Sequence, residues 1–598
     1  LDPRMYGTNL AMWDSLLTAT QTGTLLRKMN FGALRFPGGS LSDDYNWQTN
    51  RRVSGSPAWT WASHVANFAQ VVEAQGTAAY VIVNYGSGTP EQAAAWVAYH
   101  NGNPASTQAL GTDAKGRDWK TVGYWASLRA AAPLATDDGY NFLRVSHPAA
   151  YGFQHWEVGN ECYGSWEYDE HGVAGTGLTG VAHDPVTYAQ AFQNFARQML
   201  AVDPTIKIGA VITSTESDNA SATSVVNPRT GLSYSGWTPV VLRTLKTLGV
   251  TPHFVIYHYY AQNPGNESDF ALLQGTTRLD TDAASIRQML TDYIGGSAAD
   301  GIEMTMTELN SVSSAPGKQT ANLVNAIFYA DAYGTLAHTE YTTVLWWALH
   351  NSAETTNNNS ASLYGWRQFG CYDLIAGSGF PGLAVHTPLP TYQAATLLTH
   401  WARGGDEILA TTSNYALLSS HAARHADGRL SLLVVNKHPT AALTAQIALA
   451  GFIPGSATAT VYAYGKDNDA LGSAQPDYTT ASFGGAAATF AYTFPAYSIT
   501  VLELASPITF ADQPANTTVR DGLPAGFTVT ASGPGTLTYQ WQRSLDRGTT
   551  WTDLTEGTAY TGVTTPALTV SQARANDSGQ RFRCVVTLAG GGRVASAA

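Results

Sequence analysis

Two short apolar stretches of the chain each end in a glutamate. The first is His-Trp-Glu-Val-Gly-Asn-Glu at residues 155–161, and the second is Met-Thr-Met-Thr-Glu at residues 304–308. Two carboxyl groups at the tips of two strands match what hydrolysis of a glycosidic bond requires. One protonates the leaving oxygen, and the other attacks the anomeric carbon. Glu161 and Glu308 are therefore predicted to be a catalytic pair.

The neighbour of the first glutamate indicates the role of each. Asn160 precedes Glu161 and can hydrogen-bond the 2-hydroxyl of a sugar, so Glu161 is predicted to be the acid and base. Glu308 is then the nucleophile of a retaining reaction, which needs carboxyl groups about 5 Å apart. We expect partial burial and repulsion from Glu308 to raise the pKa of Glu161.

Three further polar residues are predicted to surround the pair. Arg35 ends an early strand and can hold a carboxylate by charge-assisted hydrogen bonds. His258 and Tyr260 share one face of a later strand, because alternate residues point the same way, and either can reach Glu308 or the substrate. Taken singly, Arg35 is more often a salt-bridge residue and His258 more often a satisfied core histidine.

A tryptophan pair and two further glutamates also lie on predicted strands. Trp346 or Trp347 is expected to form the floor of the sugar site, and only one of them can face inward; we assign Trp346. Glu157 is expected to face the helix layer or a buried partner. Glu303 starts its strand, so it is expected at the end of the barrel away from the chemistry.

Eight short strands in the first 400 residues must position these groups. Several are continuous apolar runs, as buried parallel strands are. They are residues 5–10, 32–37, 78–85, 154–159, 207–212, 254–260, 303–309 and 343–349. Helical patterns separate them at residues 61–75, 90–100, 185–202, 238–248, 282–294 and 318–336.

Eight such β/α units predict an α/β fold of the (β/α)8 TIM-barrel type over residues 1–400. A doubly wound sheet is the alternative, but it needs a phosphate-binding glycine loop, and residues 36–39 (Phe-Pro-Gly-Gly) are not one. Long loops are expected at residues 101–149, 215–234 and 351–380. Barrel enzymes build their sites from the loops at the strand ends.

The pattern changes after residue 400. Five stretches alternate apolar and polar residues and predict a β-sandwich over residues 401–505. Residues 506–598 are expected to form an immunoglobulin-like β-sandwich, with Trp541 as its buried tryptophan. Phe582 stands where such modules carry a corner tyrosine, and no cysteine lies on the partner strand, so Cys584 is expected to be a free, buried thiol.

Composition narrows the class of protein. The 598-residue chain has a formal net charge of −12 and no basic run, which argues against nucleic acid as a partner. No apolar stretch reaches the length of about 20 residues that a membrane span needs. The three cysteines have no metal-ligand spacing, so we expect no metal and no cofactor; pairing of Cys162 with Cys371 is left open. We expect a removed signal peptide and a secreted or periplasmic location.

With these residues in place, the chain resembles glycoside hydrolase clan A, the retaining barrel glycosidases, and most closely the family 51 α-L-arabinofuranosidases. Four motifs carry the resemblance: residues 35–39 with 45–47, residues 159–166, residues 258–260 and residues 308–310. The resemblance covers residues 1–505 and implies the acid/base at Glu161, the nucleophile at Glu308 and a β-sandwich beside the barrel.

Three departures from the family bear on the substrate, and one is the long loop of residues 101–149, which we do not associate with arabinofuranosidases. Ser40 stands where asparagine is usual, and Tyr163 where an acidic residue is usual. Trp47 and Trp166 are predicted to bind substrate, and Trp125 with Tyr163 can line further subsites, although core positions suit these aromatics equally well.

The favoured substrate is an α-L-arabinofuranoside on arabinan or arabinoxylan. An endo-β-1,4-glucanase or xylanase of the same clan is the first alternative, and a carbohydrate-binding protein without activity is the second. A plant-type polysaccharide or oligosaccharide is the expected partner in each case. The oligomeric state cannot be predicted from the sequence.

Overall fold

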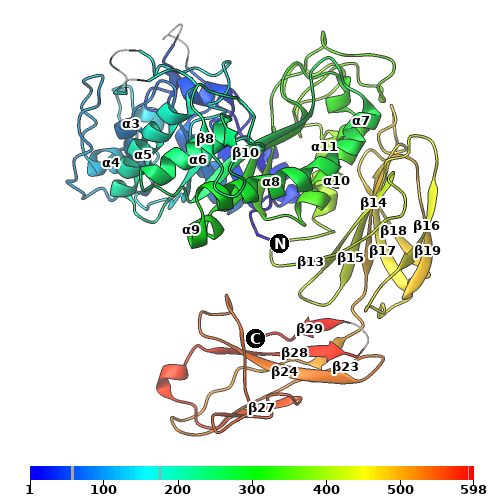
Figure 1. The fold of residues 1–598 in the computed structure, drawn as a ribbon. Helices are drawn as coiled ribbons and strands as arrows, with labels where there is room; N and C mark the ends of the chain where they lie inside the picture. Colours follow the sequence, from blue (N-terminus) through cyan, green and yellow to red (C-terminus); the bar gives the residue numbers. More distant parts are fainter. Residues whose placement is uncertain (55–59, 174, 176, 179, 590–591) are drawn as a thin grey trace. The chain divides into compact units, whose positions relative to one another are not determined.

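The computed structural model has two compact units (Figure 1). One unit comprises residues 2–396, and the other comprises residues 397–598 together with Leu1. The structure describes residues 1–54, 60–173, 175, 177–178, 180–589 and 592–598. Each unit has hydrophobic clusters of its own.

Eight parallel strands close into a barrel in the first unit. In pairing order they are β1 (Tyr6–Asn9), β12 (Tyr341–Trp346), β11 (Glu303–Val312), β10 (Phe254–Gln262), β7 (Lys207–Val211), β6 (His155–Val158), β5 (Ala78–Val83) and β2 (Ala33–Phe36). The strands are buried over nearly their whole length, because helices cover the outside and side chains fill the inside. The eight predicted strands and the (β/α)8 barrel are confirmed. Two short hairpins, β3–β4 (Tyr45–Asn46 and Arg51–Arg52) and β8–β9 (Val225–Val226 and Ser233–Tyr234), lie in its loops.

Helices surround the barrel, and the helix at Pro90–Asn101 begins at its predicted proline signal. The six predicted ones are α2 (Val65–Gln75), α3 (Pro90–Asn101), α5 (Pro185–Val202), α6 (Trp237–Thr247), α8 (Arg278–Tyr293) and α10 (Leu323–Leu336), the last preceded by a 3-10 turn, η4 (Lys318–Ala321). Proline in the first turn, behind a Thr89 or Asp184 cap, starts α3 and α5. Figure 1 shows α3, α5, α6 and α8 side by side, each contacting the next. None of the helices in the described ranges is long and apolar enough to cross a membrane.

Five helices lie outside the predicted set: α1 (Thr20–Met29), α4 (Val122–Ala130), α7 (Asp269–Gln274), α9 (Gly296–Asp300) and α11 (Pro390–Leu398). Helix α4 lies in the stretch 101–149 that was expected to be a long loop. It is only nine residues long, and its polar, glycine-rich flanks conceal it in the sequence. The buried Arg129 side chain secures α4, because it donates hydrogen bonds to the carbonyl oxygens of Tyr99, His100 and Gly102.

Antiparallel sheets follow the barrel, as predicted for the β-sandwich region. A six-stranded sheet has the order β13 (Glu407–Leu409), β14 (Leu418–Arg424), β15 (Leu430–Asn436), β20 (Ser498–Leu504), β17 (Thr458–Gly465) and β18 (Thr479–Gly484). A second sheet pairs β16 (Leu443–Ala448) with β19 (Thr489–Phe494). Leu432, Val461, Phe490 and Leu502 belong to one apolar cluster drawn from both sheets.

The last part of the chain forms three further small sheets. A four-stranded sheet has the order β25 (Thr552–Asp553), β24 (Leu537–Ser544), β28 (Arg581–Leu588) and β29 (Arg593–Ala595). The others are β22 (Ala525–Thr528), β27 (Ala567–Val570) and β26 (Tyr560–Thr561), and the pair β21 (Thr509–Asp512) and β23 (Thr530–Ser532). Trp541 is fully buried in the core of this part. All three cysteines are buried and unpaired, so Cys162 and Cys371 form no disulfide and Cys584 is free, as expected.

Replacement of Trp541 is predicted to destabilise this last part of the chain. The indole is fully buried, and its Nε1 donates to the carbonyl oxygen of Thr565 at 2.9 Å. The Trp541→Ala variant leaves a cavity and an unpaired carbonyl, so we expect a loss of about 3–5 kcal/mol in unfolding free energy, measured by urea denaturation. The half-buried Trp551 is the control: equal losses for Trp551→Ala and Trp541→Ala would contradict the assignment of Trp541 to the core.

Candidate active site

A sharp turn directly after β6 places Glu161. Gly159 has φ +77°, and a Cβ built on it would lie 2.3 Å from Sγ of Cys162, so only glycine fits there. Glu161 itself has φ +40°, in the left-handed region that side chains other than glycine adopt at a cost. The turn thereby brings the Glu161 carboxyl to β10, where it contacts His258.

An irregularity between β10 and β11 places His258 opposite Glu308. Tyr257 pairs with Met306, whereas the next residue, His258, pairs with Glu308, so Thr307 is an extra residue on β11. Such a bulge re-aims the side chains around it. Nε2 of His258 lies 3.1 Å from Oγ1 of Thr307, so the extra residue also orients the imidazole.

The two glutamates lie close together across the barrel mouth. One oxygen of Glu161, one oxygen of Glu308 and a ring nitrogen of His258 all lie within 4.8 Å of one another. Nδ1 of His258 is 3.0 Å from Oε1 of Glu161 and 3.6 Å from Oε2 of Glu308. The sequence predicted that His258 would reach Glu308 or the substrate, but its shorter contact is with Glu161.

Glu308 is held by donors on both of its oxygens. Nη1 of Arg35 donates to Oε1 at 2.9 Å, and the Tyr260 hydroxyl donates to Oε2. Both side chains are where the strand pattern predicted them. These contacts stabilise a carboxylate and leave little freedom in its orientation.

Glu161 has a different set of partners. Tyr163 Oη donates to Oε1 at 3.1 Å, and Trp166 Nε1 donates to Oε2 at 3.0 Å. Burial alone would raise the pKa of Glu161. The hydrogen bond and charge of His258, with the bonds from Trp166 and Tyr163, nevertheless lower this pKa below its usual value. The expected rise in the Glu161 pKa is therefore wrong, because the sequence analysis counted burial and repulsion but not these donors.

A second buried carboxylate shares Arg35. Glu157 is fully buried, and Arg35 pairs with it at 2.9 Å in addition to Glu308. Glu157 thus belongs to a buried pair and does not face the helix layer. Burial raises the pKa of Glu157 against the opposing effect of the Arg35 charge.

Asn160 lies between Arg35 and a buried acidic group that sequence analysis missed. Its Oδ1 accepts from Nη2 of Arg35 at 3.0 Å, and its backbone N–H donates to Oδ2 of Asp43 at 2.9 Å. Asp43 also accepts the backbone N–H groups of Tyr85 and Gly86. Burial raises the pKa of Asp43 in spite of these donors. Asp43 lies in the 3-10 turn η1 (Ser40–Asp44), after the glycine pair that follows β2. That position is the one sequence signal that could have identified Asp43 as a site residue.

The predicted tryptophans divide between site and core. Trp166 is 61% exposed and contacts Glu161, as a substrate-binding residue should. Trp47 is buried in a cluster with Trp96 and Trp125, and its Nε1 donates to the Gln92 carbonyl, so the substrate role predicted for Trp47 is wrong. The suggested subsite role of Trp125 fails for the same reason.

The choice between the tryptophans at the end of β12 is also corrected. Trp346 is fully buried and packs on Phe328 and Tyr329 of α10, so it faces the helix layer. Trp347 instead lies against Gly39, in the loop after β2. A Cβ on Gly39 would come within 2.7 Å of the Trp347 ring. Trp347 is therefore the better candidate for the floor of the site, because that loop is at the carboxyl end of the strands.

Among the described residues, one group could hold a metal ion, and it is the trio Glu161, His258 and Glu308. A histidine nitrogen with two carboxylate oxygens is a donor set that many divalent ions accept. The same three side chains are already joined by the short contacts given above, and those contacts account for their geometry without an ion.

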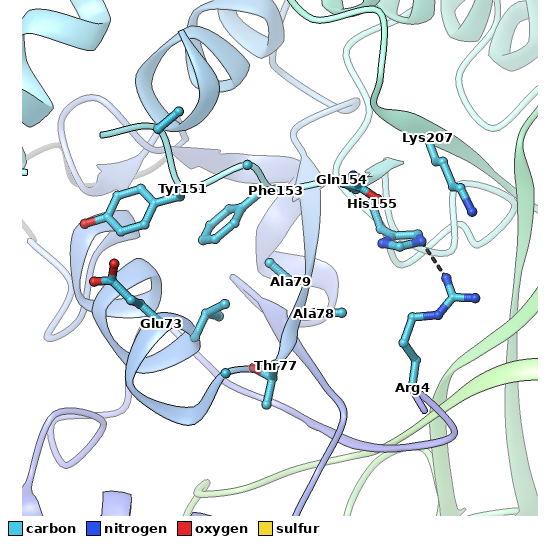
Figure 2. A pocket seen from close by; sticks show the side chains of 14 residues that line it. Arg4, Glu73, Thr77, Ala78, Ala79, Tyr151, Phe153, Gln154, His155 and Lys207 are labelled. Carbon is cyan, nitrogen blue, oxygen red and sulfur yellow. Dashed lines mark hydrogen bonds between the residues drawn. The ribbon is translucent and has the colours of Figure 1, made fainter. Parts of the chain in front are cut away.

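A cavity of about 460 Å³ lies at the opposite end of the barrel strands. It is lined by the first residues of β5, β6 and β7, and Figure 2 shows Arg4, His155 and Lys207 at one end of it and Glu73 with Tyr151 at the other. Two of its cationic side chains, Arg4 and Lys207, are paired with Glu303. Glu303 thus lies away from the chemistry, as predicted, because barrel enzymes keep their sites at the other end.

Comparison with known proteins gives matches in sequence over part of the chain. No family model matches. The chain is 27% identical over 194 residues to the probable alpha-L-arabinofuranosidase C of Aspergillus clavatus, covering 31% of this chain and 30% of the relative. It is 23% identical over 193 residues to alpha-L-arabinofuranosidase C of Emericella nidulans, covering 31% of this chain and 30% of that protein. The chain thus spans about 30% of the length of the curated relatives it matches.

Solved structures match over most of the chain. The alpha-L-arabinofuranosidase of Thermotoga maritima in complex with arabinose is 18% identical, with a TM-score of 0.59 over 84% of this chain and 97% of that one. The family 51 arabinofuranosidase of Thermotoga petrophila is 20% identical, with a TM-score of 0.58 over 84% and 97%. A family 44 xyloglucanase of Paenibacillus polymyxa is 15% identical, with a TM-score of 0.53 over 85% and 97%. The chain therefore shares the overall fold of these solved structures.

Proposed function

We propose that the chain is a retaining glycoside hydrolase that acts on plant-type polysaccharide, with Glu161 as acid/base and Glu308 as nucleophile. The observation that carries the proposal is the spacing of the pair, with one oxygen of each within 4.8 Å of the other. Retaining enzymes hold their carboxyl groups about 5–5.5 Å apart, whereas inverting enzymes leave about 6.5–9.5 Å for a water molecule. The spacing supports double displacement.

The partners of each glutamate suit the two steps. Arg35 and Tyr260 donate hydrogen bonds to Glu308 and fix its direction, so its carboxylate attacks the anomeric carbon while Glu161 gives its proton to the leaving oxygen. In the second step Glu161 takes a proton from water, and the water oxygen displaces Glu308 from the sugar. His258, with its ring nitrogen 3.0 Å from Glu161, favours the carboxylate used in this second step.

We propose that the sugar removed is an α-L-arabinofuranose. The curated relatives, which match about 30% of their own length, are named arabinofuranosidases, and the barrel folds of family 51 support the same choice. The alternative is endo action on a β-1,4-glucan or xylan. The exposed ring of Trp166 beside Glu161 favours that alternative, since a flat apolar surface next to the acid can carry further sugar units.

The proposal also covers the domain organisation of the chain and its location. We propose three domains: a catalytic barrel at residues 1–400, a β-sandwich at 401–505 and an immunoglobulin-like domain at 506–598. The buried Trp541 and the antiparallel sheets around it support the immunoglobulin-like assignment. A secreted or periplasmic location fits an enzyme whose substrate is an extracellular polymer.

The substrate proposal predicts the products from a panel of polymers. We expect arabinose alone to be released from arabinan and arabinoxylan, with no shortening of xylan or β-1,4-glucan, as measured by chromatography of the products. Oligosaccharides released from xylan or glucan would favour the endo alternative. Binding without turnover of any polymer would favour the carbohydrate-binding alternative and reject the enzyme.

Loss of the nucleophile is predicted to abolish turnover. In Glu308→Ala the carboxylate that Arg35 and Tyr260 hold is gone, so kcat should fall by at least about 10⁴-fold. Added azide should restore turnover and give a glycosyl azide of inverted configuration, detected by NMR. The control is Glu303→Gln, at the other end of the same strand, which should keep its activity. Unchanged turnover by Glu308→Ala would reject the mechanism.

The donors on Glu161 predict a pH effect. Removal of a hydrogen bond that lowers the pKa of Glu161 should raise this pKa, so the acid form persists to higher pH. In Trp166→Phe, which keeps an aromatic ring but loses the Nε1 donor, we expect the decline of kcat/KM with rising pH to move to higher pH. Tyr163→Phe should act in the same direction. The control is Trp551→Phe, which removes an Nε1 that donates to the carbonyl oxygen of Gly548. A shift of the decline to lower pH in Trp166→Phe would contradict the assignment.

A further inference from the structure

The buried side chain of Glu167 contacts Asn160 and has no role in the mechanism proposed for Glu161 and Glu308. Glu167 follows β6 in the same loop as Glu161 and is 5% exposed. Its Oε1 accepts hydrogen bonds from Oγ of Ser40 at 2.8 Å and from Nδ2 of Asn160 at 3.1 Å. Its Oε2 is buried and has no hydrogen-bond partner in the described part of the chain.

These contacts determine how the Asn160 amide is oriented. Arg35 can only donate, so the oxygen of the amide must face Nη2 of Arg35, as the 3.0 Å contact shows. The amide nitrogen then faces Glu167, which accepts one of its two hydrogens. The other hydrogen has no acceptor among the described residues, and it is available to a hydroxyl of a sugar bound at the neighbouring Glu161.

We propose that Glu167 is a positioning residue for the glycosidase reaction: by holding one N–H of the Asn160 amide, it aims the other at the 2-hydroxyl of the bound sugar. This inference rests on the proposed function and extends it to a residue in the loop after β6. Hydrogen bonds to the 2-hydroxyl strengthen in the transition state, so the orientation of Asn160 should affect kcat more than KM.

The geometry also indicates whether Glu167 holds the Asn160 amide as a neutral acid or as a carboxylate. Both donors bond to Oε1, as to a carbonyl oxygen, and the bare, buried Oε2 suits the hydroxyl of a neutral acid better than half of a carboxylate. Burial raises the pKa of Glu167, and the charges of Asp43 and Glu161 raise it further. Glu167 gives up no proton during the reaction and acts only as a neutral acceptor.

The surroundings of Glu167 predict the result of its ionisation. The ionisable groups that face it are Asp43 from η1, with Glu161 and the Cys162 thiol from the turn after β6. All of these are acidic, and Arg35 reaches Glu167 only through Asn160. Ionisation at high pH therefore adds an uncompensated negative charge beside Glu161 and disturbs the amide, so activity is expected to decline on the alkaline side.

The test uses the full chain and an aryl α-L-arabinofuranoside with a dinitrophenolate leaving group, which leaves without protonation by Glu161. The kinetic constants kcat and KM are measured against pH for four variants: Glu167→Gln, Glu167→Ala, Ser40→Ala and the control Glu170→Gln. Glu170 lies in the same loop but pairs with Lys115 outside the site, so its variant should behave as the unmodified protein.

Each variant has a distinct expected result. Glu167→Gln, which keeps a neutral acceptor, should retain kcat at neutral pH within about twofold and lose the alkaline decline. Glu167→Ala should lower kcat by about tenfold with KM little changed. Ser40→Ala removes a bond that lowers the pKa of Glu167, so the alkaline decline should move to higher pH.

Two outcomes would overturn the inference while leaving the proposed function intact. One is unchanged kcat in Glu167→Ala, and the other is an alkaline decline that stays in place in both Glu167→Gln and Ser40→Ala. If Glu167→Ala fails to fold, as judged by circular dichroism, the other two variants still decide between the outcomes. No activity in the unmodified protein on any arabinofuranoside would overturn the proposed function and this inference together.

Discussion

The burial of one guanidinium group is the constraint on which the site depends. Arg35 has no exposed surface, and a charge in that position is tolerated only if every donor is paired. Its donors reach Asn9, Glu157, Asn160 and Glu308, which lie on β1, on β6, just after β6 and on β11. Three segments that are distant in the sequence are therefore tied together by one side chain, which contacts Glu308 directly and Glu161 only through the neighbouring Asn160.

The same constraint makes the two glutamates unlike each other. Arg35 already pairs with Glu157, so Glu308 shares a cation and gains the Tyr260 hydroxyl as a second donor. Glu161 lies outside the reach of Arg35 and depends on His258 and two aromatic donors from its own loop. Its side chain is also the more exposed, 16% against 5% for Glu308. Identical side chains thereby suit the different tasks of proton transfer and nucleophilic attack.

The strands were predictable, because continuous apolar runs that alternate with helical patterns leave few other folds. The two glutamates were singled out because they end predicted strands, although β11 continues past Glu308 to Val312 and Glu161 lies in the turn after β6. The failures concern residues whose surroundings come from elsewhere in the chain. Trp47 is buried by Trp96 and Trp125 of the outer helices, and no local pattern reveals this. Trp346 and Trp347 lie where β12 ends, so the rule of alternation does not decide which faces inward. The pKa of Glu161 depends on side chains of a loop whose path the sequence does not specify.

Three buried acids lie beside the candidate site, close to the residue proposed to bind the sugar. Glu157, Asp43 and Glu167 are all buried near Asn160, and Arg35 is the one cation that contacts this group in the described part of the chain. Burial raises the pKa of all three acids, which favours their neutral forms, and a neutral acid can hold an amide without repelling Glu308. Ser40 and Glu167 belong to the loops after β2 and β6, outside the strands. The strands therefore position the two glutamates that we propose as the catalytic pair, while Ser40 and Glu167 come from the loops beside them.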